Sequence, residues 1–347
     1  MRIGLCSTAH LHVDAYVDNL RAAKAVVVGV ADDDTQRGRR WGLRHDVPWF
    51  PTHESLLEAG VDGVIVCAET ARHRRVVELA AQAGVAVLCE KPLATTAEDA
   101  RAIVEACEAA GVPLMTAFPM RFSPPMQQAR ALLTRGTIGT LHAAVGTNQG
   151  ALPMRHRSWF VDPALSGGGA LMDHVVHLVD VLRWYLGEEV AEVYCRTNRL
   201  LHADAVTVET GGLLLLTMDS GLFASIDCSW SKPDTYPTWG GLTLEVVGSE
   251  GVLGIDPFAQ RLTVHGGPEG PLAWPQWGSD ANQGLIDEFL DVIAQRRPPA
   301  VTGHDGLAAT CVALAGYTSM ATGQPVTMAA AAVTGSPQHY SAKGPPP

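Results

Sequence analysis

The sequence has few of the features that mark nucleic-acid-binding, secreted or membrane-spanning proteins. Lys and Arg number 25 against 36 Asp and Glu, a formal net charge of -11, whereas a protein that binds a phosphate backbone needs a basic face. No apolar stretch reaches the ~20 residues that span a bilayer, and the N-terminus enters a strand-like run without a signal-peptide pattern. We therefore expect a cytoplasmic protein with a small-molecule ligand and no nucleic-acid or membrane partner.

The seven cysteines include no CxxC pair, so a zinc-ribbon arrangement has no support. Three of them, Cys6, Cys67 and Cys89, lie in or at the end of strand-like apolar runs. This pattern favours buried, reduced thiols in a cytosolic protein.

Glycine is scarce where a dinucleotide-binding turn needs it. The first strand–helix junction is Ser7-Thr-Ala-His-Leu-His12, and the three glycine positions fall on Ser7, Ala9 and His12. Ser7 and Ala9 are small enough for a tight turn near phosphates, but His12 is bulky where helix and strand should pack closely. Thr8 can donate its hydroxyl to a phosphate or cap the helix. Ser7, Thr8 and Ala9 are therefore candidate cofactor ligands, and the pose of the pyrophosphate and its affinity stay open.

The first 120 residues do contain a regular alternation of strands and helices. Apolar runs at 3–6, 25–31, 63–67, 85–89 and 113–117 alternate with helical segments, and Gly84 and Gly111 end two of these helices. Alternation with short connections predicts a parallel, doubly wound sheet of the Rossmann type. Because 347 residues are long for one core, we expect a second domain after this NAD-binding domain at 1–120.

After residue 120 the pattern changes to consecutive strands flanked by helices. Helices are expected at 124–136, 170–186, 283–295 and 306–322, and strands at 141–149, 190–197, 205–218, 221–230, 242–248 and 251–255. This predicts an α/β chain whose second domain, 121–330, is an α+β unit with a large open mixed or antiparallel sheet. The small, polar, proline-rich segment 331–347 is expected to be a disordered tail.

A carboxylate stands at the end of the second expected strand. The run 28–31 leads directly into Asp32, Asp33 and Asp34. A carboxylate at this point accepts hydrogen bonds from the adenosine ribose diol and repels a 2′-phosphate. No Arg or Lys follows immediately, so Asp32 favours NAD over NADP. The alternative is a solvated acidic turn that caps the next helix, and Asp33 and Asp34 are expected at the surface.

Two motifs direct a lysine, a carboxylate and an imidazole toward one cleft. Glu90-Lys91-Pro92 follows the apolar run 85–89, so Lys91 is expected at the carboxyl end of a strand. Asp173 and His177 follow the glycines 167–169 and, being four apart, share one face of a helix. A histidine titrates near neutrality and suits general acid–base work. This set suits proton transfer coupled to hydride transfer.

These motifs resemble the glucose–fructose oxidoreductase/inositol dehydrogenase (Gfo/Idh/MocA) family over about residues 2–328. The resemblance rests on Glu90-Lys91-Pro92 and Asp173-x-x-x-His177 above all, and also on segments 30–32, 84–94, 120–124, 136–139, 167–180, 245–251 and 317–319 and on His73. It implies an NAD-dependent oxidoreductase that transfers a hydride between nicotinamide and a secondary alcohol or ketone of a sugar, cyclic polyol or sugar-like compound.

The resemblance also implies roles for the candidate catalytic residues. His177 is the expected base, Asp173 is expected to hydrogen-bond and orient the substrate, and Lys91 is expected to stabilise developing alkoxide charge. His73 joins the candidate cofactor set. The resemblance requires no metal and none is expected, although Asp173, His177 and Asp180 offer normal metal ligands.

Three further candidates for the cofactor side each have two interpretations. Glu90 fixes its loop or reaches the nicotinamide ribose. Arg121 faces the cofactor or substrate side of the cleft or forms a surface salt bridge. Trp159 stacks on the nicotinamide or a sugar ring, or anchors its loop. His174 points away from Asp173 and is expected to be structural.

Two other functions remain alternatives on the sequence alone. One is a redox-neutral sugar lyase or glycosidase that uses tightly bound NAD. The other is a non-catalytic nucleotide-binding regulator of the same fold, which the glycine-poor turn favours and the Lys–Asp–His set opposes. The broad second sheet suggests a subunit interface, so a homo-oligomer, dimer or tetramer, is expected.

Overall fold

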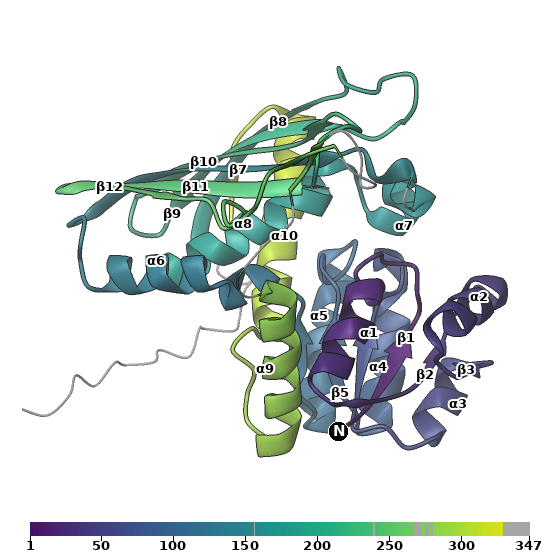
Figure 1. Cartoon of the computed structure of the whole chain (residues 1–347). Helices are drawn as coiled ribbons and strands as arrows, with labels where there is room; N and C mark the ends of the chain where they lie inside the picture. Colours follow the sequence, from purple (N-terminus) through teal and green to yellow (C-terminus); the bar gives the residue numbers. More distant parts are fainter. Residues whose placement is uncertain (156, 239, 267–271, 275–277, 279, 329–347) are drawn as a thin grey trace, which may run out of the picture.

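A computed structural model describes residues 1–155, 157–238, 240–266, 272–274, 278 and 280–328. The expected tail at 331–347 lies outside the described residues. Among the described residues, no helix combines the length and apolar character that crossing a membrane requires. The chain forms two sheets with helices packed on them (Figure 1).

The first sheet has six parallel strands in the order β3-β2-β1-β4-β5-β6, which confirms the expected Rossmann arrangement. The strands are β1 Arg2–Cys6, β2 Val26–Ala31, β3 Trp49–Phe50, β4 Gly63–Val66, β5 Ala86–Cys89 and β6 Leu114–Thr116. β4 and β5 are apolar and buried along their whole length, as expected of central parallel strands covered on both faces. The strand order reverses beside β1, and doubly wound sheets bind ligands at the carboxyl edge of such a point.

The helices of this layer begin and end at residues suited to those positions. They are α1 Val13–Ala22, α2 Thr35–His45, α3 His53–Glu58, α4 His73–Gln82 and α5 Ala97–Ala110, with the short 3₁₀ helix η1 at Thr70–Arg72. Asp34 caps α2 by accepting the backbone N–H groups of Gln36 and Arg37, so it is a helix cap as well as a surface residue. Gly111 ends α5 in the left-handed conformation that glycine adopts without strain.

The second sheet is mixed, with seven strands in the order β12-β11-β7-β10-β9-β8-β15. They are β7 Leu141–Ala151, β8 Val190–Asn198, β9 Gly211–Met218, β10 Phe223–Lys232, β11 Gly240–Gly248, β12 Gly251–Ile255 and β15 Val326–Thr327. β7 runs parallel to β10, and the other neighbouring strands are antiparallel. A two-stranded ribbon, β13 Val264–His265 and β14 Leu272–Ala273, lies outside this sheet.

The strand expected at 205–218 begins only at Gly211. Residues 205–210 form turns and bends instead. Val206 and Val208 belong to a small buried cluster with Ala170 and Trp230. These valines pack against the start of a helix, and packing of this kind overrides their preference for a strand.

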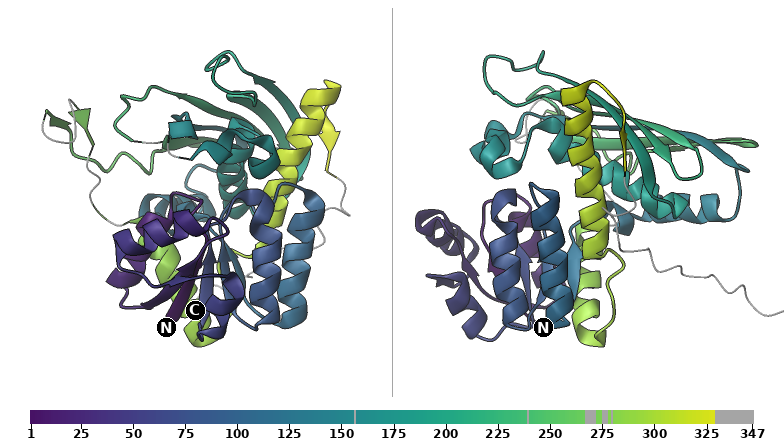
Figure 2. Two further views of the ribbon diagram at one scale, coloured as in Figure 1. Left: turned by 90° about the vertical axis from the view of Figure 1, so that its right-hand side faces the viewer. Right: turned by 180° about the vertical axis from the view of Figure 1, so that it is seen from behind.

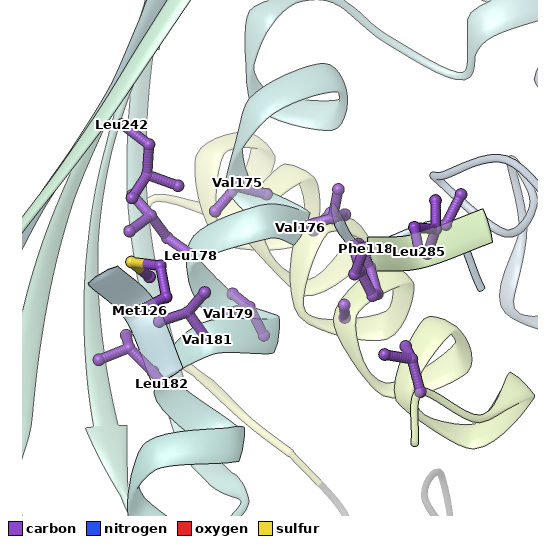
Figure 3. Packing of buried hydrophobic residues seen from close by; sticks show 14 of the residues in the cluster. Phe118, Met126, Val175, Val176, Leu178, Val179, Val181, Leu182, Leu242 and Leu285 are labelled. Carbon is purple, nitrogen blue, oxygen red and sulfur yellow. The ribbon is translucent and has the colours of Figure 1, made fainter. Parts of the chain in front are cut away.

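One face of the second sheet packs on α8 Ala170–Leu186, the central helix of the molecule. In Figure 3, Val175 and Leu178 lie toward Leu242 of the sheet, whereas Val176 lies beside Phe118. All of these side chains are buried, so α8 is apolar on nearly every side. Its few polar residues therefore need partners within the protein.

The remaining helices connect the two sheets. They are α6 Pro124–Thr134, α7 Pro163–Ser166, α9 Ala281–Gln295 and α10 Gly303–Thr322, with 3₁₀ helices η2 Pro119–Phe122, η3 Pro153–Arg155 and η4 Ser158–Val161. α9 returns to pack on α1, and α10 runs from α5 to α8 and β8 (Figures 1 and 2). Although the chain passes from one sheet to the other near residue 120, its last helices belong to the packing of both.

A buried ion network joins two of these connecting elements, η2 and α10, to α8. The Arg121 guanidinium on η2 donates to both carboxylate oxygens of Asp180 on α8, at 2.9 and 2.6 Å. Asp305 of α10 lies 3.0 Å from the same guanidinium and also pairs with Arg183 at 3.0 Å. A two-pronged pair of this kind fixes orientation as well as distance.

We predict that Arg121→Ala lowers the free energy of unfolding by about 3–5 kcal/mol, because it leaves the buried Asp180 without its cation. Urea unfolding followed by circular dichroism measures the change. Arg74→Ala is the matched control, since Arg74 also pairs with two carboxylates, Glu78 and Asp99, but at the surface. Equal and small effects of the two substitutions would show that the Arg121 network does not stabilise the fold.

Candidate active site

Lys91 and Asp173 form a buried ion pair between the two halves of the molecule. Lys91 follows β5 and Asp173 lies in the first turn of α8; they are 2% and 5% exposed. The Lys91 Nζ donates to Asp173 Oδ1 at 2.8 Å and to the Asp173 backbone carbonyl at 3.1 Å. Burial alone would raise the pKa of Asp173, but the charge of Lys91 and hydrogen bonds to the carboxylate hold it well below its usual range. Asp173 is therefore an anion at neutral pH.

Trp230 fixes the second oxygen of the same carboxylate. This fully buried residue of β10 donates its indole N–H to Asp173 Oδ2 at 3.2 Å. Because Oδ1 faces Lys91 and Oδ2 faces the indole, the carboxylate cannot rotate without losing one of these partners. Trp230 thus fixes the orientation of the Asp173 carboxylate from the second sheet.

The triple glycine before α8 places Asp173 by allowing close packing at the start of the helix. Glu209 Oε1 accepts the backbone N–H groups of Gly169 and Leu171 at 2.9 and 3.0 Å, and Tyr317 donates to the same oxygen at 2.7 Å. A Cβ on Gly168 would overlap the Tyr317 hydroxyl, and one on Gly169 would overlap the Glu209 backbone. Glycine is therefore required for the cap that orients this helix.

The two histidines of α8 occupy different surroundings. His174 is buried, its Nε2 lies 3.4 Å from Asp173 Oδ2, and its backbone carbonyl accepts an N–H from Asn148 at 3.0 Å. His177 is partly exposed and meets Phe118 edge-on, with ring centroids 5.9 Å apart. Burial of its ring and the nearby charge of Lys91 hold the pKa of His177 well below 6.5. His177 is therefore a neutral imidazole at neutral pH, able to accept a proton.

The turn after β1 keeps the conformation of a glycine turn without its glycines. Ser7 has φ 72°, in the left-handed region, and its Oγ accepts the Ala9 backbone N–H at 3.2 Å. The Ala9 carbonyl in turn accepts the indole N–H of Trp159 at 3.0 Å and the Arg157 Nε at 2.9 Å. Trp159 thus holds the segment around η4 on the turn, which corresponds to the loop-anchoring interpretation of this residue.

Asp32 lies at the end of β2 with every carboxylate oxygen hydrogen-bonded. Oδ2 accepts the backbone N–H of Thr8 at 2.7 Å and its hydroxyl at 2.6 Å. Arg37 clasps the same carboxylate, with Nη2 2.6 Å from Oδ1 and Nε 3.0 Å from Oδ2. Burial would raise the pKa of Asp32, but the hydrogen bonds from Arg37 and Thr8 lower it. No Lys or Arg directly follows Asp32 in the sequence, but Arg37, in the first turn of α2, folds back onto the Asp32 carboxylate.

Glu90 is fully buried and ties the end of β5 to the start of α1. Its Oε1 accepts the Tyr16 hydroxyl at 2.7 Å and lies 2.9 Å from His12 Nδ1 and 3.5 Å from His10 Nδ1. Its Oε2 accepts the Lys91 backbone N–H at 3.1 Å. These contacts agree with a role in fixing the loop that presents Lys91. Sequence reasoning missed His10 and Tyr16, and the His-x-His spacing before a buried helix was the available signal.

Two candidate cofactor residues are engaged by other groups of the protein. The ring nitrogens of His73 each lie 3.1 Å from a backbone carbonyl, that of Leu93 or that of Ala68, so His73 supports the turn that follows Lys91. Arg121 pairs with Asp180, which lies two helical turns, about 10 Å, beyond Asp173. The salt bridge expected as the alternative for Arg121 exists, but it is buried and not at the surface. Asp180 is thereby engaged by a cation and not available as a metal ligand.

Comparison with known proteins matches nearly the whole described chain. Residues 2–118 match the family model described as "Oxidoreductase family, NAD-binding Rossmann fold", and residues 126–254 match the GFO/IDH/MocA C-terminal domain. The chain is 29% identical to D-apiose dehydrogenase of Paraburkholderia graminis, covering 94% of this chain and 88% of that protein. It is 27% identical to myo-inositol 2-dehydrogenase of Thermotoga maritima, covering 92% and 96%.

Among solved structures, the chain is similar to GenD2 from gentamicin A biosynthesis, crystallised in complex with NAD. The TM-score is 0.86 at 26% identity, with 95% of this chain and 97% of that chain covered. A putative myo-inositol dehydrogenase from Sinorhizobium meliloti matches with a TM-score of 0.79 at 26% identity, covering 95% and 100%. The similarity therefore extends over both sheets and not only over the Rossmann layer.

We predict that the ion pair makes stability fall in acid. The pKa of Asp173 is lower in the folded protein than its value of about 3.9 in the unfolded chain. The contribution of Asp173 to the free energy of unfolding is therefore present above about pH 3.9 and is lost as the pH falls below that value. One such group can contribute as much as about 1.4 kcal/mol per pH unit to the pH dependence of the free energy of unfolding. Thermal or urea unfolding between neutral pH and about pH 3 should show a smaller acid slope in Asp173→Asn. Asp18→Asn, on an exposed carboxylate, is the control whose slope should match the native chain.

Proposed function

We propose that this chain, which belongs to the Gfo/Idh/MocA family of oxidoreductases, transfers a hydride between NAD and a secondary alcohol or ketone of a sugar, cyclic polyol or sugar-like compound. It is an oxidoreductase that acts on CH–OH groups, as are the apiose, inositol and xylose dehydrogenases to which it is similar. The observation that carries the proposed mechanism is the Lys91–Asp173 pair, 2.8 Å long, with His177 one helical turn along α8.

Each residue of this set has a distinct proposed role. Asp173 holds the Lys91 ammonium, which has three N–H donors, two of which are used on Asp173 within the described structure. The remaining donor binds the substrate oxygen and stabilises negative charge as it develops there. His177, neutral and partly exposed, takes the hydroxyl proton and passes it toward solvent. NAD, when bound at the carboxyl edge of the first sheet, supplies the hydride acceptor.

We propose that residues at that edge bind the dinucleotide. Ser7 supplies the left-handed turn, and Thr8 and Ala9 follow it beside β1, where doubly wound sheets bind ligands. Asp32 is the proposed ligand of the adenosine ribose. Because Arg37 now occupies that carboxylate, we propose that the guanidinium moves aside or packs on the adenine when the ribose binds. Glu90 is proposed to hold the Lys91 loop against the nicotinamide side.

The outer face of the second sheet is proposed as the contact between copies of the chain. Large apolar side chains on that face are about half exposed, namely Val145, Leu213, Leu215, Phe223 and Val252. Strand register places them on the face opposite α8. Exposed apolar side chains gathered on one surface are typical of interaction sites. A cytoplasmic location is proposed because all seven cysteines are free thiols.

We predict that His177→Asn lowers kcat for polyol oxidation by about 100-fold or more, since it removes the proton acceptor. The native kcat/KM should lose activity in acid only below pH 6.5, because His177 must be neutral and its pKa is depressed. This acid limb should disappear in His177→Asn. Initial rates of NADH formation over a panel of sugars and polyols, from about pH 5 to 9, measure both effects.

Lys91→Gln should also lower kcat by orders of magnitude. Lys91→Ala is a poorer test, since it leaves the buried Asp173 Oδ1 with neither the cation nor an N–H donor, whereas the amide of Lys91→Gln can still donate to it. His142→Asn, on an exposed residue of β7, is the control for loss of a histidine. Normal turnover in both His177→Asn and Lys91→Gln would exclude the mechanism. Turnover of sugar without net NADH release would indicate the redox-neutral chemistry instead.

The proposed preference for NAD over NADP is tested with the Asp32→Ser variant. The carboxylate that repels a 2′-phosphate is then gone while Arg37 remains to bind one. We expect kcat/KM with NADP relative to NAD to rise about tenfold or more, without an added arginine. Arg37→Gln in the same background should reverse the gain. An unchanged ratio in Asp32→Ser would remove Asp32 from its proposed role.

A further inference from the structure

We propose that His10, His12 and Glu90 form a binding site for one divalent transition-metal ion of the zinc type. Each of the three side chains offers a ligand atom, and these atoms all lie within 4.8 Å of one another. Two imidazoles and one carboxylate are a frequent ligand set for zinc and for iron(II). The proposed hydride transfer assigns no role to the convergence of His10 and His12 on Glu90.

The spacing of the ligand atoms suits a single ion. In a tetrahedral site with metal–ligand bonds of about 2.0–2.2 Å, neighbouring ligand atoms lie about 3.3–3.5 Å apart. Glu90 Oε1 is 3.5 Å from His10 Nδ1 and 2.9 Å from His12 Nδ1. Of these two distances, only the second, a hydrogen bond, must lengthen, by about 0.5 Å. Because His12 is partly exposed, its ring can make this adjustment.

His10 shows that the fold by itself leaves this site incompletely satisfied. The ring is 2% exposed, and its Nε2 has no hydrogen-bond partner among the described residues. Burying an imidazole with unmet hydrogen-bonding capacity is unfavourable. Its Nδ1 lies 3.5 Å from Glu90 Oε1 and, among the described residues, accepts a hydrogen bond only from the His12 backbone N–H, at 3.3 Å. A metal bond at Nδ1 would replace this long hydrogen bond and offset part of the cost of burying the ring, while Nε2 would keep no partner among these residues.

Neighbouring groups donate hydrogen bonds to the Glu90 carboxylate, as the residues around a metal site commonly do to its ligands. Tyr16, which is fully buried, donates its hydroxyl to Glu90 Oε1 at 2.7 Å. The Lys91 backbone N–H donates to Oε2 at 3.1 Å. Such partners orient ligating carboxylates and raise metal affinity. Three protein ligands leave a fourth position for water or for an oxygen of a bound molecule.

The site also accounts for the unusual turn after β1. His12 occupies the third glycine position, where a bulky side chain is unexpected. In the structure its ring turns toward Glu90 and meets His10 edge-on, with centroids 4.3 Å apart. His12, one of the three positions that depart from the glycine pattern, thus converges with His10 on the Glu90 carboxylate.

Titration of the full chain with Co²⁺, after chelator treatment and without NAD or substrate, tests the proposal. We expect one equivalent to bind, with the visible absorption of tetrahedral cobalt, and Zn²⁺ but not Mg²⁺ to displace it. His12→Ala and Glu90→Gln should weaken binding by about 100-fold or more, beyond the 10–100-fold typical of outer-shell changes, and Tyr16→Phe by about tenfold. Circular dichroism checks that each variant is folded.

His304→Gln is the matched control. His304 lies 2.8 Å from Glu108, a histidine–carboxylate pair on the surface without a third ligand. This variant should bind Co²⁺ as the native chain does. The proposal is overturned if the native chain binds no cobalt, or if His12→Ala and Glu90→Gln bind it with native affinity. Because the titration contains neither cofactor nor substrate, its outcome is independent of whether the chain carries out the proposed hydride transfer.

Discussion

The buried pair between Lys91 and Asp173 is the contact on which the arrangement of the site depends. It joins the end of a Rossmann strand to the first turn of the helix beneath the second sheet. A buried ammonium or carboxylate without a partner is strongly unfavourable, so the two layers must meet at this point. This contact between the two layers therefore brings a cation, a carboxylate and the imidazoles of α8 close together.

Around this pair, residues from the other layer or from distant segments hold Asp173, its helix and the turn after β1. Trp230 fixes Asp173 from the second sheet, Glu209 caps the helix that carries it, and Trp159 reaches across to the Ala9 turn. Long-range contacts of this kind preorganise a site better than contacts within one loop. The proposed hydride transfer and the proposed metal site use two consecutive residues of the chain, Lys91 for the first and Glu90 for the second.

The turn after β1 shows how a binding motif can lose its glycines and keep its shape. Ser7 adopts the left-handed conformation that the first glycine normally supplies, at a cost of about 1 kcal/mol or more. The surrounding hydrogen bonds, from Ser7 to Ala9 and from Arg157 and Trp159 to the Ala9 carbonyl, hold it there. The turn therefore has the left-handed backbone conformation at Ser7 although the residue is not a glycine.

The sequence by itself determined most of the longer elements and the family. Their limits follow largely from apolar periodicity and from stop residues such as Gly84 and Gly111, because these signals are local, whereas at residues 205–210 packing decided against the expected strand. Only the tertiary structure decided which distant residues meet: β7 inserted beside β10, Arg37 folded back on Asp32, Arg121 paired with Asp180, and His10 and His12 turned to Glu90. Such pairings depend on strand order and on the direction of each helix, and a residue's chain neighbours specify neither.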